Sequence, residues 1–139
     1  MTPDHTALEK SLGQLEKSLG YLNSEAARSD TGLREQFRTA TIKAFEYTYA
    51  CAVAVVRRRL AELSENPGAV DEIPFLDQMR MAGEAGLLRN PAAFREFREA
   101  RNITAHTYEE ELAERVIGVL DGFVGEMHFL LGQLKRGNA

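Results

Sequence analysis

The sequence has one cysteine, four prolines, no tryptophan and no long apolar run. A single cysteine excludes an intrachain disulfide, and because Cys51 lies among apolar residues we expect a buried thiol. No segment reaches the roughly 18 apolar residues of a membrane span, and no basic start followed by an apolar core marks a signal peptide. Zinc and P-loop patterns are also absent. These absences predict a cytoplasmic protein with no membrane contact, no metal and no cofactor.

The residues that are present favour one helical domain. A chain of 139 residues has a single-domain length, and 44% hydrophobic with 27% charged residues is ordinary for a globular protein. Ala, Leu, Glu and Arg are abundant, which biases the chain towards helix. The net charge of −4 gives the whole protein no electrostatic attraction to nucleic acid, so contact with RNA needs a local basic patch.

Helical periodicity fills the first half of the chain. A first helix is expected to begin at Thr2-Pro3 or at Thr6. Its leucines recur at alternating spacings of four and three, at Leu8, Leu12, Leu15, Leu19 and Leu22. A polar connection leads to a central helix, Leu33–Leu63, which no proline or glycine interrupts. Its apolar run Ala50–Val56 is expected to be surrounded by neighbouring elements.

The end of the central helix carries the basic triplet Arg57–Arg59. Cations near a helix C-terminus are favourable in themselves, so a solvated face is the default interpretation and a phosphate-binding site is the alternative. Pro67-Gly68 then marks a loop. Pro74 and Gly86 bound a shorter helix, and Asn90-Pro91 begins the next one with Asn90 as its cap.

Apolar residues from Leu112 to Leu134 predict one long amphipathic helix at the end of the chain. It contains Gly118, Gly122 and Gly125, which weaken a helix but allow another helix or a second subunit to approach closely. Together the helical segments predict an all-α, up-and-down four-helix bundle with an additional short helix, organised around the central helix.

The polar segment Ala100–Glu111 concentrates side chains that can do chemistry. Arg101, Asn102, His106 and Tyr108 supply a permanent cation, an amide, an imidazole and a phenol. An imidazole titrates near neutrality and can therefore transfer protons under physiological conditions. The segment lies between two predicted helices, and we interpret it as a junction at which side chains converge.

The spacing within this segment constrains its geometry. Arg101 and His106 lie about 140° apart around a straight helix, so they meet only if the helix ends between them or if a second chain supplies one of them. Thr107 followed by Glu110 is a capping-box pattern, which predicts a break near His106. Glu46 of the central helix is a further candidate. It is either a partly exposed helix carboxylate or a polar neighbour of the His106 site.

The run Arg101–Tyr108 resembles the R-x4-H-x-Y motif of the HEPN superfamily. It is most similar to the branch that contains HepT toxins and nucleotidyltransferase substrate-binding proteins. The run Phe37–Tyr49 resembles the long second helix of that branch, and the resemblance extends from about Leu8 to Leu134. It implies a single HEPN-like helical-bundle domain over residues 1–139.

The resemblance also implies a function. Two motifs would face each other across a homodimer cleft and cleave RNA without a metal, with Arg101 on the phosphate and His106 transferring protons. Asn102 and Glu46 are the supporting residues that we expect beside them. The resemblance further implies a separately encoded minimal nucleotidyltransferase as partner, an antitoxin that transfers AMP to Tyr108.

Three hypotheses follow for the chain. It is a HepT-like toxin whose ribonuclease activity is silenced by AMP transfer, or a non-catalytic substrate-binding subunit of a two-component nucleotidyltransferase. In the third hypothesis the motif only ties two helices together. The acidic run Glu109–Glu111 would weaken RNA binding beside the motif unless Arg95, Arg98 and the arginine of a second subunit outweigh it.

Overall fold

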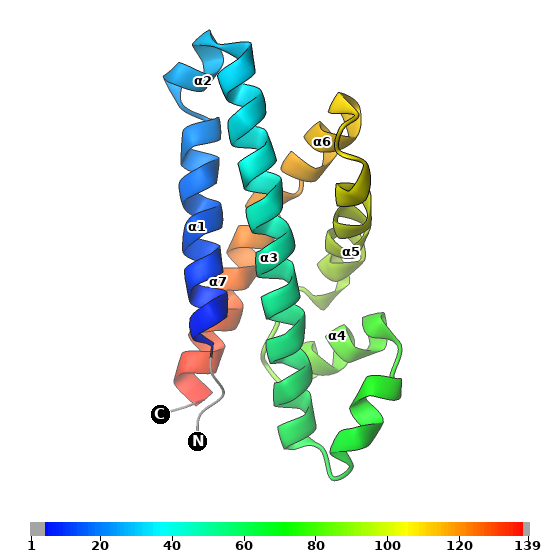
Figure 1. The fold of residues 1–139 in the computed structure, drawn as a ribbon. Helices are drawn as coiled ribbons and strands as arrows, with labels where there is room; N and C mark the ends of the chain where they lie inside the picture. Colours follow the sequence, from blue (N-terminus) through cyan, green and yellow to red (C-terminus); the bar gives the residue numbers. More distant parts are fainter. Residues whose placement is uncertain (1–4, 138–139) are drawn as a thin grey trace.

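The computed structural model describes residues 5–137, which form an antiparallel bundle of helices (Figure 1). These residues contain seven α-helices and no β-strand, which confirms the predicted all-α, up-and-down bundle with an additional short helix. In chain order the α-helices are α1 Thr6–Leu22, α2 Glu25–Ser29, α3 Thr31–Leu63, α4 Phe75–Glu84, α5 Phe94–Ile103, α6 Glu110–Ile117 and α7 Leu120–Gly137. Short 3-10 turns lie at Pro67–Glu72, Pro91–Ala93 and Thr104–His106.

The antiparallel pair α1 and α3 forms one side of the bundle (Figure 1). The predicted leucine stripe of α1 is buried at Leu8, Leu12, Leu15 and Leu22, whereas Leu19 is only partly buried. α1 begins at Thr6, and the other predicted start, Thr2-Pro3, lies outside the described residues. α3 begins after Asp30, whose Oδ1 accepts a hydrogen bond of 3.1 Å from Leu33 N and so satisfies one free donor of the first turn.

Aromatic rings tie the central helix to α5 and α7. Phe45 of α3 meets Phe123 of α7 edge-on at a centroid separation of 4.9 Å, and Phe97 of α5 meets the same ring at 5.2 Å. All three side chains are at most 2% exposed. Edge-to-face pairs stabilise a core beyond the burial of their apolar area. The core therefore fixes the direction in which α5 delivers its C-terminal residues.

Two predictions for the central helix are wrong. Ala50 and Ala54 are exposed, so the run Ala50–Val56 is not surrounded, and Cys51 is only partly buried. Neighbouring helices cover only part of the circumference of α3. Alanine tolerates the open part because its methyl group exposes little apolar surface, so apolar sequence alone did not reveal this face.

The predicted long C-terminal helix is two helices. α6 ends at Ile117 and α7 begins at Leu120, with Gly118 and Val119 in the turn between them. Val116 and Leu120 are both fully buried, so the apolar periodicity continues through the break and conceals it in the sequence. The bend lets α6 pack against α5 and α3 while α7 runs beside α1.

The glycines of α7 do not bring another helix close within the chain. A Cβ at Gly122 would meet nothing within 4 Å, and a Cβ at Gly125 would first meet the Arg89 side chain at 3.7 Å. The prediction of close helix packing at these two positions is therefore wrong for the single chain. A dimer contact on this helix stays a prediction.

Glu126 of α7 takes the place of the cap that we expected at Asn90. The Asn90 side chain makes no capping hydrogen bond. Instead Glu126 of α7, which is 3% exposed, accepts backbone hydrogen bonds from Arg89 N at 2.7 Å and from Asn90 N at 3.1 Å. A carboxylate from a distant helix thus fixes the chain as it enters α5, which no local sequence pattern indicates.

Candidate functional site

The predicted break falls inside the motif. α5 ends at Ile103, the 3-10 turn Thr104–His106 follows, and α6 begins at Glu110 (Figure 1). The expected capping box is not formed, because the hydroxyl of Thr107 donates to the Thr104 carbonyl oxygen at 3.3 Å. Glu109 takes the N-cap position of α6 without a side-chain hydrogen bond. The motif therefore turns the chain from α5 into α6.

Arg101 is tied to the central helix through Thr104 and Glu46. Its Nη1 lies 3.2 Å from Thr104 Oγ1 and 3.6 Å from Glu46 Oε2. Thr104 Oγ1 also lies 3.0 Å from Glu46 Oε2 and 2.6 Å from the Arg101 carbonyl oxygen, and these two acceptors compete for its one proton. Thr104 is 8% exposed, so this contact is the buried part of the motif. Glu46 thus lies against Arg101 and makes no hydrogen bond or ion pair with His106.

The rest of the motif faces solvent. Tyr108 is 83% exposed, and His106 and Asn102 are exposed as well. The rings of His106 and Tyr108 lie edge-on with centroids 6.3 Å apart. Within residues 5–137, no hydrogen bond, ion pair or ring contact joins Arg101 to His106, and Asn102 bonds to neither. One chain therefore presents both side chains at one turn without pairing them.

Two arginines of α3 hold α6 in place. Arg34 Nη1 and Nη2 donate to the two carboxylate oxygens of Glu114 at 2.7 and 3.1 Å, and Arg38 Nη1 donates to Glu114 Oε2 at 2.8 Å. These hydrogen bonds, those from Arg34 first, lower the pKa of Glu114 to about 2, although partial burial acts in the opposite direction. The cluster fixes α6 and with it the turn that carries His106 and Tyr108.

This cluster predicts that the fold is acid-sensitive. The pKa of Glu114 is about 2 in the folded chain and ordinarily 4.5, so its contribution to the free energy of unfolding is complete above pH 4.5 and is lost as the pH falls towards 2. Glu114→Gln should lower the melting temperature at neutral pH and flatten this part of the pH profile. Thermal unfolding followed by circular dichroism measures both effects.

The matched control for that measurement is Glu111→Gln, which removes the same charge from an exposed position of the same helix. It should leave the slope of stability against pH as in the wild type. A Glu114→Gln profile that superposes on the wild-type profile would show that the cluster contributes nothing to stability.

Thr104 and the Glu114 cluster are not among the site residues expected from the sequence. Thr104 could have been found, because a position three residues after Arg101 lies on the same helix face. Arg34 and Arg38 share a face of α3 for the same reason. Nothing in the sequence connects them with Glu114, which lies 80 and 76 positions further along the chain.

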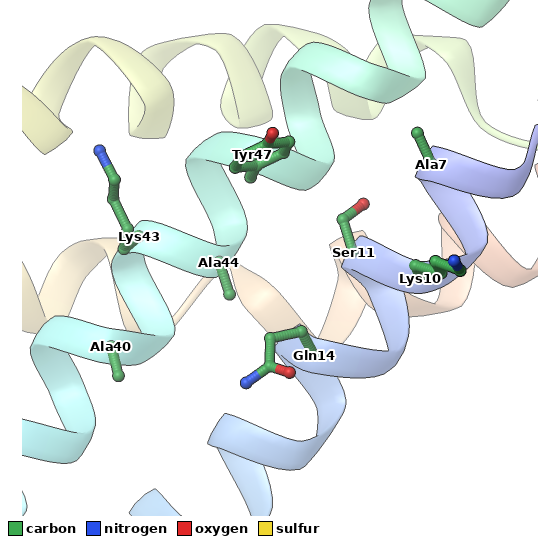
Figure 2. Close-up of a pocket in the computed structure, with 8 residues that line it drawn as sticks. All are labelled: Ala7, Lys10, Ser11, Gln14, Ala40, Lys43, Ala44 and Tyr47. Carbon is green, nitrogen blue, oxygen red and sulfur yellow. The ribbon is translucent and has the colours of Figure 1, made fainter.

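A groove of about 560 Å³ between α1 and α3 is separate from the motif. Figure 2 shows its two walls, with Ser11 and Gln14 on α1 and Ala44 and Tyr47 on α3. No residue of Arg101–Tyr108 lines it. The candidate site is therefore the exposed turn between α5 and α6 and not this groove.

Residues 5–137 hold no cluster of three or more His, Cys, Asp and Glu side chains arranged to bind a metal ion. None of their helices has both the length and the apolar character that crossing a membrane requires.

A known family matches nearly the whole chain. The family described as "Nucleotidyltransferase substrate binding protein like" matches residues 4–136. The chain belongs to this family. The HepT-like resemblance predicted from the motif Arg101–Tyr108 is thereby confirmed.

Two matches from Haemophilus influenzae, a protein sequence and a solved structure, are similar to this member of the substrate-binding family. One, named probable ribonuclease HepT, is 34% identical over 97 residues, which are 70% of this chain and 66% of that protein. The match therefore spans just under two thirds of the relative's length. The other is a solved structure described as revealing the fold of a substrate binding domain of a nucleotidyltransferase. It superposes with a TM-score of 0.89 at 26% identity, covering 95% of this chain and 99% of that chain.

Proposed function

We propose that this chain is the toxin of a toxin–antitoxin pair, a metal-independent ribonuclease that acts as a homodimer. A separately encoded minimal nucleotidyltransferase silences it by transferring AMP to Tyr108. The observation that carries the proposal is the exposed turn that presents Arg101, His106 and Tyr108 in the order R-x4-H-x-Y. The 34% identity with a protein named probable ribonuclease HepT supports it. We place the pair in the cytoplasm, with residues 1–139 acting as one domain.

A homodimer supplies the contact that one chain lacks. Within one chain Arg101 and His106 do not interact, yet both can be reached from solvent. A two-fold axis beside the turn between α5 and α6 sets the two motifs opposite each other. Arg101 of one subunit then faces His106 of the partner subunit across a cleft that can hold a phosphate.

RNA cleavage in this cleft uses the motif side chains. His106 takes the proton from a 2′-hydroxyl, and the resulting oxygen attacks the neighbouring phosphorus. The bond from phosphorus to the 5′-oxygen breaks, and the imidazolium returns its proton to that leaving oxygen. Arg101 holds the phosphate oxygens with its planar fork of donors. The products are a 2′,3′-cyclic phosphate and a 5′-hydroxyl.

Glu46 and Asn102 support this chemistry in different ways. Glu46 and Thr104 hold the Arg101 guanidinium in place before RNA binds. The pair between Glu46 and Arg101, at 3.6 Å, is long enough for a phosphate to take over the guanidinium. The exposed amide of Asn102 lies next to Arg101 and can donate a further hydrogen bond to the substrate.

Silencing follows from the exposure of Tyr108. Its phenol oxygen attacks the α-phosphorus of an ATP held by the nucleotidyltransferase, pyrophosphate leaves, and a base of that enzyme takes the phenol proton. A side chain that is 83% exposed can enter the active site of another protein while the protein that carries it stays folded. The attached AMP adds bulk and negative charge beside His106, which repels an RNA phosphate.

The second candidate function is a non-catalytic subunit that binds the substrate of a two-component nucleotidyltransferase. The descriptions of the family and of the solved Haemophilus influenzae protein favour it. In that case Arg101 and His106 would hold a substrate for the nucleotidyltransferase and would not cleave RNA. RNA cleavage in the presence of a chelator separates the two candidates.

Mixed dimers test the proposed cleft. Arg101→Ala and His106→Ala homodimers should each lose RNA cleavage by about 100-fold or more. A dimer with one subunit of each kind keeps one intact Arg101 opposite one intact His106, so it should recover about half of the wild-type rate. Each subunit carries a different affinity tag, and rates are measured with a fluorescent RNA in EDTA.

The controls are the two parent homodimers prepared with the same pair of tags. A mixed dimer no faster than its parents would contradict a site shared between subunits. Wild-type protein that is inactive in EDTA would contradict the ribonuclease and favour the substrate-binding candidate.

A further inference from the structure

The packed helices α3 and α5 include the arginines Arg57, Arg98 and Arg101 and one largely buried tyrosine, Tyr49. Tyr49 of α3 is 8% exposed, and its hydroxyl makes no hydrogen bond within the described residues and is not fully enclosed. Burial raises the pKa of Tyr49, while the positive charges of Arg98, Arg101 and Arg57 act in the opposite direction. The geometry agrees, because Arg98 and Tyr49 both lie against the Phe75 ring of α4. Gln78, the hydrogen-bond partner of Arg57, follows Phe75 by one turn of that helix.

Arg57 is held in place by a buried neutral partner. Its Nε donates to Gln78 Oε1 at 3.0 Å. Gln78 is 1% exposed and is itself fixed, because its Nε2 donates to the Val70 carbonyl oxygen at 2.8 Å. Since Gln78 carries no charge, the charge of Arg57 is not neutralised, and its two terminal nitrogens make no hydrogen bond in the described part of the chain.

Arg98 is oriented by aromatic rings. Its Cζ lies 5.1 Å from the centroid of the Phe75 ring, which lies 6.4 Å from the ring of Tyr49. Arg98 lies one helical turn before Arg101, so the two follow each other along one face of α5. Among residues 5–137, Glu46 is the one carboxylate that pairs with any of the three arginines. These arginines thus give this face of α3 and α5 a local excess of positive charge, although the net charge of the whole protein is −4.

We propose that Arg57, Arg98 and the Tyr49 hydroxyl form a second phosphate subsite, which binds the backbone of single-stranded RNA beside the phosphate held by Arg101. The proposal rests on the proposed function, because it extends the cleavage site along the strand. Guanidinium and phenol groups donate to phosphate oxygens. The Phe75 ring is occupied by Arg98 and Tyr49, so it offers no platform for a base. The subsite therefore binds the backbone without reading the bases.

The test is RNA binding by protein that cannot cleave, with His106→Ala as the background. In this background Arg57→Gln/Arg98→Gln should weaken binding of a fluorescent single-stranded RNA to a similar degree for different sequences. It should also make the slope of log affinity against log salt shallower, reducing its magnitude by about 1.4. Each phosphate of a single strand that the protein neutralises adds about 0.7 to that magnitude. Tyr49→Phe keeps the ring and should weaken binding without changing the slope.

The matched control is Arg28→Gln/Arg136→Gln, which removes two exposed charges from other parts of the bundle and should leave the slope unchanged. Circular dichroism checks that each variant is folded. If the double variant of Arg57 and Arg98 unfolds, the two single variants replace it. Each should reduce the magnitude of the slope by about 0.7.

Three outcomes would overturn the subsite. Arg57→Gln/Arg98→Gln leaves the slope unchanged, or the control variant changes the slope equally. In the third outcome, Arg57→Gln/Arg98→Gln binds RNA normally but no longer accepts AMP from the nucleotidyltransferase. In the last case the arginines would serve the phosphates of ATP on the nucleotidyltransferase. The ribonuclease proposal fails separately. If wild-type protein does not cleave RNA but Arg57→Gln/Arg98→Gln still reduces the magnitude of the slope by about 1.4, the subsite stands as an RNA-binding site.

Discussion

His106→Ala is expected to abolish RNA cleavage and to leave the fold intact. Removing the imidazole that we propose as the proton-transfer group should lower the rate by about 100-fold or more. The ring is exposed, and its one ring contact in the described residues is with the exposed Tyr108, so the free energy of unfolding should change by no more than about 0.5 kcal/mol. Initial rates with fluorescent RNA in EDTA and thermal unfolding of the same samples measure the two effects.

His128→Ala is the matched control. His128 is an exposed histidine of α7 whose Nε2 lies 3.0 Å from Glu16 Oε2, away from the motif. This variant should cleave RNA at the wild-type rate. A His106→Ala protein that melts earlier but keeps its cleavage rate would show that the motif only ties α5 to α6.

Tyr108→Phe is expected to make the protein resistant to the proposed nucleotidyltransferase partner. The substitution keeps the ring and removes the oxygen that we propose as the AMP acceptor, and at 83% exposure the ring contributes nothing to the core. Intact-mass spectrometry after incubation with the nucleotidyltransferase, ATP and magnesium should find no adenylyl group. RNA cleavage should remain, and co-expression of the nucleotidyltransferase should no longer relieve growth inhibition.

Tyr47→Phe is the control for this substitution, because Tyr47 is also a solvent-facing tyrosine, 66% exposed, on another helix. It should accept one AMP and be silenced like the wild type. Adenylyl incorporation into Tyr108→Phe at the wild-type level would place the acceptor on another residue and contradict the assignment.

Helix positions could be predicted from the sequence wherever one apolar face packs against the bundle and residues such as proline or glycine mark the helix ends. The leucines of α1 and the limits of α4 are examples, and Gly86 ends α4 at a φ of 84°, which side chains disfavour. The prediction failed between Val116 and Leu120. Both residues are buried in different helices, so a bend and a straight helix share one hydrophobic pattern.

The motif residues could be recognised in the sequence, but their contacts could not. Thr104 and Glu46 lie 58 positions apart and meet only because α5 packs across α3. The approach of Arg98 and Tyr49 to the Phe75 ring has the same origin, since the three residues belong to three different helices. Sequence spacing constrains contacts within one helix, and only the packing of the core determines contacts between helices.

The most direct test of the central claim follows AMP transfer and RNA cleavage in the same samples. Wild-type protein is treated with the nucleotidyltransferase, ATP and magnesium for increasing times, and the enzyme and magnesium are then removed. Intact-mass spectrometry gives the fraction of the protein that carries AMP, and a fluorescent RNA in EDTA gives the cleavage rate. We expect unmodified protein to cleave RNA to 2′,3′-cyclic phosphate ends and the rate to fall to zero as modification becomes complete. Unmodified protein that does not cleave, or fully modified protein that cleaves at the original rate, would contradict the account.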